Sequence, residues 1–460
     1  MKEKSEKSKE IMVEEERELG VKPIVSLFTK FSLLTLVGVL AQVIMVLLEG
    51  VIIGRGLGER GLACIGLIFP LEYFMLALGG FFAIGISSLA AMKLGSGDKE
   101  GARRIYGQGL IFSSFTMIII ALGIYIFAPY IATLLGTPPE LMDTIILFIR
   151  IFMFGYPFCI IGHIAVYMAR VDEKPHIAAY ALAGSAIAAI LWLYSSIHIL
   201  ELGIIGSAGY YASSIGLWGV SILYFFFSKK TIFKVKKEDW KLDMKIIGAI
   251  CKVGFPYLLI QSSSTVFSIV LNNFFRKYGS STDIAAFAVI NGYIIYILVM
   301  ITQATIGGMQ PIASYNIGAK LFHRVAKLIK VSVTANLIVI YAIAIIFFVF
   351  SKQICFLFLG DSSELLDISA KYAKIILIGS GLGLTANVMS GYFQAVEKVG
   401  LSTILGVCRY ILFGIPLIYI MAKLLGNKGI WYGQPIADGA AFLLSILFCV
   451  VEVRKLKRNS

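Results

Sequence analysis

The sequence predicts an all-α polytopic membrane protein with twelve transmembrane helices in two pseudo-twofold six-helix bundles. Three observations predict it. Of the 460 residues, 58% are hydrophobic and only 15% are charged, whereas a soluble domain carries roughly 45–50% apolar and about 25% charged residues. The apolar residues form long runs, such as 337–350 and 411–422, and inside a bilayer only helices of that length satisfy the backbone. The two halves of the chain also resemble each other.

The internal repeat has an offset of about 224 residues. The segment Glu140–Asp143 (ELMD) returns as Glu364–Asp367 (ELLD), and the charged corner Val171–Lys174 returns as Ala395–Lys398. A duplicated polytopic chain is typically built around a central cavity between its two halves. The repeat therefore indicates a transporter.

The expected helices follow the apolar runs in order. They cover residues 25–53, 62–92, 103–129, 140–170, 174–198, 203–228, 245–275, 283–316, 322–350, 364–396, 398–423 and 428–452. Several exceed the roughly 20 residues that a span needs, so they tilt or project beyond the bilayer. We expect an N-lobe over residues 24–228, a basic linker over 229–244 and a C-lobe over 245–452.

The ends of the chain are polar. Residues 1–23 lack the apolar core of a signal peptide, so a disordered or surface-lying cytosolic tail is expected there. Residues 453–460 are expected to form a second cytosolic tail.

Lys and Arg gather in the loops on one predicted side of the membrane. These loops cover residues 93–104, 170–174, 229–245, 320–330, 398 and 454–458. By the positive-inside rule both termini face the cytoplasm of a multi-pass protein in the cell membrane. The net charge of +14 is explained in this way, and no basic face or motif indicates nucleic-acid binding.

Three segments resemble one transporter family. They are Glu49–Pro70, with an acidic residue before a Gly-Arg turn, Gly308–Lys320 (GMQPIASYNIGAK), and Gln434–Asp438 (QPIAD). Together they resemble multidrug and toxic compound extrusion (MATE) transporters, in particular the MepA-like branch, over residues 24–452. One segment departs from the family. Residues 188–194 (AAILWLY) lack the Asn and the Asp-Pro that many members carry in helix 5.

The resemblance implies a V of two bundles that works by alternating access. It implies a secondary active antiporter that exports organic, often cationic, compounds and is driven by H+ or Na+, with no other cofactor. The expected partners are a small-molecule substrate and the lipid bilayer, and the protein is expected to be monomeric. A flippase for lipids or lipid-linked saccharides, of the same superfamily, is the alternative. No nucleotide domain, nucleophile, metal or CxxC motif is visible, so an enzyme is not expected.

The candidate coupling residues are Glu49 and Glu72, because acids inside a bilayer are costly and usually functional. Glu49 shares a helix face with Thr35 and Gln42, at spacings of seven residues. The alternative places Glu49 near the outer surface, in water. Glu72 is expected to pair with Arg150, either as a clamp or as a protonation switch.

The candidate substrate cavity takes in polar residues of both halves. These are Gln42, Arg150, His163, Gln261, Asn272, Tyr296, Gln303, Asn387 and Arg409. Several continue as polar stripes, and such stripes also serve as hydrogen-bonding glue between helices. A lone His163 is more often a core residue than a proton relay. Arg409 is expected to be neutralised by Asp438.

Overall fold

The computed structural model describes residues 17–209, 231–359 and 363–459, and these residues are almost entirely helical. Eleven of the described helices are long and apolar enough to cross a membrane. The all-α prediction is therefore confirmed. Of the predicted helix 203–228, residues 203–209 are helical and the remainder lies outside the described residues.

The first half is built from five main helices. They are α3 (Ile24–Gly95), α4 (Lys99–Ile126), α5 (Ala128–Leu134), α6 (Met142–Val171) and α7 (Pro175–His198). Helix α3 contains two spans, Ile24–Gly58 and Cys64–Gly95. The chain reverses between them at Gly58, where φ is 63° and ψ is −158°, a conformation that favours glycine.

The second half has nine helices in its described part. They are α9 (Met244–Tyr278), α10 (Ser281–Val289), α11 (Tyr296–Gly318), α12 (Phe322–Val349), α13 (Ser351–Leu359), α14 (Ser363–Ala395), α15 (Val399–Val407), α16 (Ile415–Leu425) and α17 (Asn427–Arg458). Wider π-helical turns, η3 (Ile290–Ile295) and η4 (Cys408–Gly414), interrupt the helices predicted over 283–316 and 398–423. Helix α17 continues to Arg458 with Leu456 buried, so most of the predicted C-terminal tail is helix.

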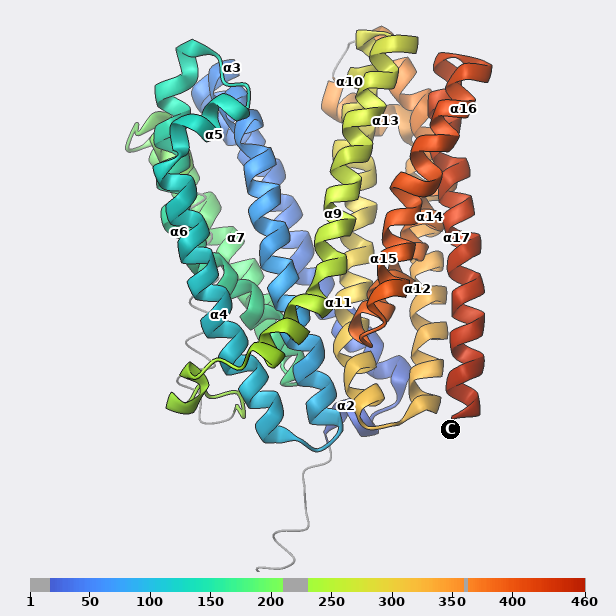
Figure 1. Ribbon diagram of the computed structural model, residues 1–460. Coiled ribbons are helices and arrows are strands. Elements are labelled where there is room, and N and C mark those ends of the chain that lie inside the picture. Colours follow the sequence, from blue (N-terminus) through green and yellow to red (C-terminus); the bar gives the residue numbers. More distant parts are fainter. Residues whose placement is uncertain (1–16, 210–230, 360–362, 460) are drawn as a thin grey trace, which may run out of the picture.

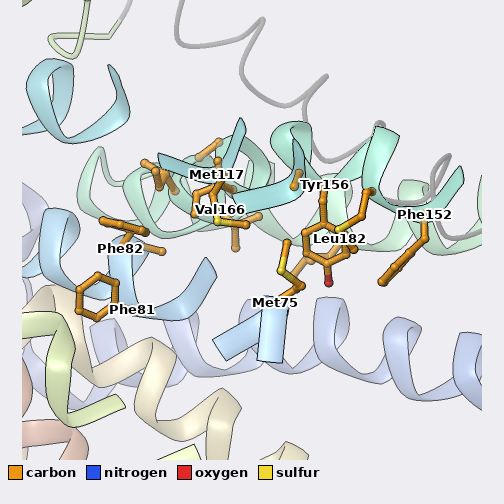
Figure 2. Close-up of a cluster of buried hydrophobic side chains, with 14 of the residues drawn as sticks. Met75, Phe81, Phe82, Met117, Phe152, Tyr156, Val166 and Leu182 are labelled. Carbon is orange, nitrogen blue, oxygen red and sulfur yellow. The ribbon is translucent and has the colours of Figure 1, made fainter. Parts of the chain in front are cut away.

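Helices α3–α7 form one group and α9–α17 the other (Figure 1). Helix α2 (Glu18–Val21) and the C-terminus lie at the same end of the molecule, which we call the terminal end. Figure 2 shows the core of the first group, where Met75, Met117, Tyr156 and Leu182 bring together α3, α4, α6 and α7. These side chains are buried because each helix turns an apolar face to its neighbours.

The first long helix of each group begins inside the core of the other group. Ile24, Leu27 and Phe31 at the start of α3 are buried in a core formed with α11, α12 and α14 of the second group. Ile247 and Val253 at the start of α9 are buried in the core of the first group. Each group therefore depends on a segment of the other.

At the terminal end the two groups meet backbone to backbone. A Cβ added to Gly95 of α3 would lie 1.9 Å from the Tyr315 carbonyl oxygen of α11. One added to Gly318 of α11 would lie 2.0 Å from the Met92 carbonyl oxygen. Glycine at these positions lets the helices approach closely.

Residues 17–22, which we call the N-terminal strap, connect both groups at this end. The Leu19 N–H donates to the Glu173 carboxylate (2.9 Å) beside α6, and Arg17 lies 3.8 Å from Asp172. Arg324 of α12 donates to the Lys22 carbonyl (2.7 Å) and to the Leu19 carbonyl (3.2 Å). Residues 17–22 of the predicted tail are thus held against both groups, and residues 1–16 lie outside the described residues.

The carboxylate of Asp172, which faces the strap, is buried. Burial raises the pKa of Asp172, and the nearby Lys174 and Arg17 oppose that rise. Because the pKa of Asp172 is raised in the folded protein, protonation of this carboxyl favours folding as the pH falls through that pKa, although it removes the negative charge that faces Arg17 and Lys174.

The basic linker is also held in place over its described part. Asp239, which is fully buried in the short helix η2 (Lys237–Trp240), pairs with Arg103 of α4. Gln108 of α4 donates to the Lys241 carbonyl (3.1 Å) and accepts from the Asp243 N–H (2.9 Å). The linker is therefore bound along α4.

Replacement of Gly318 by Ala should separate the two groups at the terminal end. Overpacking of this kind costs about 1–3 kcal/mol, so a fall in the thermal midpoint of the purified protein is expected. Gly123→Ala is the matched control, because no atom lies within 4 Å of a Cβ there. An equal midpoint for the two variants would contradict the close contact.

Replacement of Arg324 by Gln should release the strap. Hydrogen bonds from a charged donor contribute about 1.5–3 kcal/mol, so amide hydrogen exchange over residues 18–23 should rise by about tenfold or more. Lys327→Gln, at an exposed position of the same helix, should leave exchange unchanged. Unchanged exchange in both variants would show that Arg324 does not hold the strap.

Candidate functional site

Two predicted coupling residues of α3 lie within electrostatic range of each other. Glu49 and Glu72 interact electrostatically, and both also interact with Tyr73 and with Tyr296 of α11. We call these four residues the carboxylate cluster. Glu49 is 4% exposed, which corrects the alternative that places it in water. Glu72 is partly buried, and the Tyr156 hydroxyl lies 3.4 Å from its backbone carbonyl.

The carboxylate cluster has the chemistry of a cation site. Two ionised carboxylates in one partly dry environment repel each other, and a proton or a metal cation bound between them relieves the repulsion. The cluster takes its acids from two antiparallel spans of α3 and Tyr296 from the other group. A cation bound here would therefore lie within electrostatic range of groups from both halves of the molecule. Sequence reasoning missed Tyr73, because no pattern distinguishes it from other aromatic residues beside an acid.

The other polar residues on the Glu49 face serve helix packing. The Gln42 side chain donates to the Leu182 carbonyl of α7 (2.9 Å). The Thr35 hydroxyl donates to the Phe31 carbonyl (2.8 Å), and its methyl group packs against Gly307 of α11. Of this predicted face, Glu49 alone joins the carboxylate cluster.

The predicted pair between Glu72 and Arg150 is wrong. No ion pair joins them in the described chain, and the guanidinium of Arg150 instead lies 5.6 Å from the centre of the Tyr125 ring. The two residues were paired because the sequence puts them at comparable positions along their helices. The sequence shows how far along a helix a residue lies. It does not show toward which neighbouring helix the side chain points, because that depends on how the helices pack.

His163 and Asn387, which the repeat aligns, have different surroundings. The His163 ring packs against Gly79 of α3, where an added Cβ would lie 3.0 Å from Nδ1. Asn387 of α14 is partly buried, and its Oδ1 atom has no hydrogen-bond partner. The two halves have thus diverged at this position.

The polar stripe of α9 consists of Gln261, Thr265, Ser268 and Asn272. Within the described residues, these side chains form no hydrogen bond to another helix. Thr265 donates to the Gln261 carbonyl (3.1 Å) and Ser268 to the Ser264 carbonyl (3.0 Å), both within the same helix. Asn272 is exposed, and the Gln261 side chain is partly buried. The stripe therefore leaves polar groups available to a solvent or a substrate.

The stripes of α11 and α14 include true interhelical contacts. Gln310 lies 3.5 Å from the Gly391 carbonyl, and Gln394 donates to the Val253 carbonyl of α9 (3.3 Å). Ser390 donates to the Ser402 carbonyl of α15 (2.8 Å). Gln303 is partly buried on α11 and is not part of these contacts.

The predicted pair of Arg409 and Asp438 is confirmed. Arg409 Nε lies 2.7 Å from Asp438 Oδ1, Nη2 lies 3.3 Å from Oδ2, and the side chains are 3% and 2% exposed. Gly383 of α14 leaves room for the pair, since a Cβ there would lie 2.3 Å from Asp438 Oδ1. The charge of Arg409 is compensated, so it is not a free cation for a substrate. Within the described residues, no group of three or more His, Cys, Asp and Glu is placed to hold a metal ion.

A family model described as MatE matches residues 34–195 and, in a second segment, residues 256–420. The chain belongs to the MATE family. The two matched segments fall in the two halves, as the internal repeat predicted. The resemblance stated from the three sequence segments is confirmed.

Relatives of this MATE protein carry multidrug descriptions. "Probable multidrug resistance protein YoeA" of Bacillus subtilis is 25% identical over 86% of both chains. "Multidrug export protein MepA" of Staphylococcus saprophyticus is 25% identical over 91% of both. These descriptions give no support to the flippase alternative.

A solved structure confirms the MATE fold. The MOP superfamily transporter from Pyrococcus furiosus, whose "reverse polarity of binding pocket suggests different function", superposes with a TM-score of 0.90. The superposition covers 96% of this chain and 98% of that one, at 21% identity. Twelve helices in two bundles fit this architecture.

Loss of one member of the Arg409–Asp438 pair should destabilise the protein strongly. Asp438→Asn leaves a buried guanidinium without its counter-charge, which costs about 3–5 kcal/mol, so the thermal midpoint should fall. The double variant Arg409→Met with Asp438→Leu should recover most of that loss. Asp367→Asn is the control, because its pair with Lys352 is exposed and exposed pairs contribute little. No recovery in the double variant would contradict a local pair.

Proposed function

We propose that this MATE protein is a secondary active antiporter that exports organic, often cationic, compounds, and that the carboxylate cluster couples export to the entry of H+ or Na+. The observation that carries the proposal is the position of the cluster. Glu49 and Glu72 interact with each other and with Tyr296 across the two groups. The multidrug descriptions of YoeA and MepA support the substrate class.

The proposed mechanism is competition for one negatively charged site. A proton or sodium ion bound to the cluster cancels the charge that attracts an organic cation. Release of the ion restores that charge, so ion and substrate occupy the site in turn. Alternating access follows if each occupant favours a different arrangement of the two groups.

The departure from the family pattern at residues 188–194 of α7 supports a role for this cluster rather than for the usual family site. Residues 188–194 of α7 carry no acid or amide, so they offer no carboxylate for an ion. Glu49 and Glu72 are the acids that α3 places between the groups. The coupling site of this chain is therefore proposed in the spans of α3.

We further propose that the terminal end faces the cytoplasm in a cell membrane and that the protein acts as a monomer. The Lys and Arg residues of the loops 93–104 and 320–330 lie at or near that end, which agrees with the positive-inside rule. The interlobe contacts of Gly95 and Gly318 lie there too.

Replacement of either cluster acid should abolish coupled transport. With full-length protein in liposomes, an imposed pH gradient or, at equal pH, a sodium gradient should drive uptake of a cationic dye. Glu49→Gln and Glu72→Gln should each lower that uptake by about tenfold or more, since each removes at least about 1.4 kcal/mol of ion binding. The gradient that drives uptake identifies the ion.

The exposed acid Asp367 provides the control. Asp367→Asn should transport at the wild-type rate, because its side chain is 65% exposed and pairs only at the surface. Wild-type uptake in Glu49→Gln and Glu72→Gln would overturn the coupling role. No uptake by the wild-type protein under either gradient would overturn the proposed antiport.

A further inference from the structure

A small cavity lies between the two groups, away from the carboxylate cluster and toward the terminal end. Its wall includes Ser87 and Ser88 of α3, Tyr167 and Arg170 of α6, and Gln310 and Ser314 of α11. It has room for about one particle of the size of a water molecule. Both groups contribute to the wall, so its occupant contacts both.

Arg170 is the charged residue of this wall. The sequence places Arg170 among the loop cations, but its residue is only 5% exposed. Its Nε atom is buried and has no hydrogen-bond partner. A Cβ added to Gly307 of α11 would lie 3.1 Å from its Nη1 atom, so the guanidinium is pressed against the opposite group.

No carboxylate pairs with Arg170 among the described residues. Its guanidinium lies 5.0 Å from the centre of the Tyr167 ring and interacts with the Tyr167 hydroxyl. A neutral phenol and a ring face do not cancel a full positive charge. A buried charge without a counter-charge is strongly unfavourable, whereas Arg409 in the second half has Asp438.

We propose that this cavity binds a small monovalent inorganic anion, of the chloride class, against Arg170. The anion supplies the missing counter-charge and accepts a hydrogen bond from the Nε atom. The Ser88 hydroxyl and the second N–H of the Gln310 amide are further donors in the wall. The size of the cavity selects a halide over sulfate or an organic anion.

The anion site has a consequence for the closed terminal end. Its wall exists only while α3 and α6 lie against α11, so an anion stabilises the arrangement in which the groups touch there. Anion concentration therefore shifts the balance between the arrangements of the transporter. This effect does not depend on which ion the carboxylate cluster binds.

The test is thermal unfolding of the full-length purified protein at constant ionic strength and pH. Replacement of gluconate by chloride should raise the thermal midpoint of the wild type in a saturable way, by about 1–2 °C at roughly ten times the dissociation constant. Arg170→Gln should lose that rise, and Arg170→Lys should keep part of it because the charge remains. No chloride-specific rise in the wild type would overturn the proposal and assign the cavity to water.

The matched control is Arg150→Gln on the same helix. Arg150 also has a buried Nε atom without a hydrogen-bond partner and lies over a tyrosine ring, but it is not part of the cavity wall. It should keep the full chloride response. Loss of the response in both variants, or its persistence in Arg170→Gln, would overturn the site.

A second measurement covers the case in which Arg170→Gln does not fold. Wild-type crystals grown in bromide should show an anomalous peak beside the Arg170 guanidinium, within the cavity wall. Peaks only at the protein surface would overturn the proposal.

Discussion

The structure depends on the direct contact of helix backbones where its two halves meet. Gly95 and Gly318 bring α3 and α11 together at the terminal end without intervening side chains. Each half also buries the start of the other's leading helix, with Phe31 in one core and Val253 in the other. Packing of this density resists gradual deformation. The halves are therefore expected to move as bodies between discrete arrangements, rather than to yield locally.

That constraint gives special importance to the charges near the interface. A lipid-surrounded interior cannot solvate a charge, so each one needs a compensating group. Arg409 has Asp438 in the second half. Glu49 and Glu72 lie within electrostatic range of each other, and we propose that they bind a cation. Among the described residues, Tyr167 is the electrostatic partner of Arg170, and we propose that an anion supplies the missing counter-charge. Desolvation is costly for all of these charges. The Arg409–Asp438 pair compensates it internally, whereas at the carboxylate cluster and at the Arg170 cavity we propose that a bound ion does so.

The sequence was sufficient for the fold and for part of the site. Span length and the repeat are one-dimensional properties, so the apolar runs predicted the eleven described spans to within about six residues at each end. Arg409 and Asp438 were paired correctly because two opposite charges in adjacent spans have few other partners. The direction of a side chain around its helix is not encoded so locally. For that reason Arg150 was assigned to Glu72 instead of Tyr125, and Arg170 was placed in a loop instead of a buried wall.

The divergence of the two halves completes the argument about coupling. With an offset of 223 residues, the repeat aligns Glu49 with Asn272, but Glu49 is buried while Asn272 is exposed. An amide at the exposed position carries no charge and gives no second cation site. The second half instead contributes Tyr296, which lies within electrostatic range of the acids of the first half. An ion bound at the proposed site would act electrostatically on groups from both halves, and the proposed coupling rests on that property.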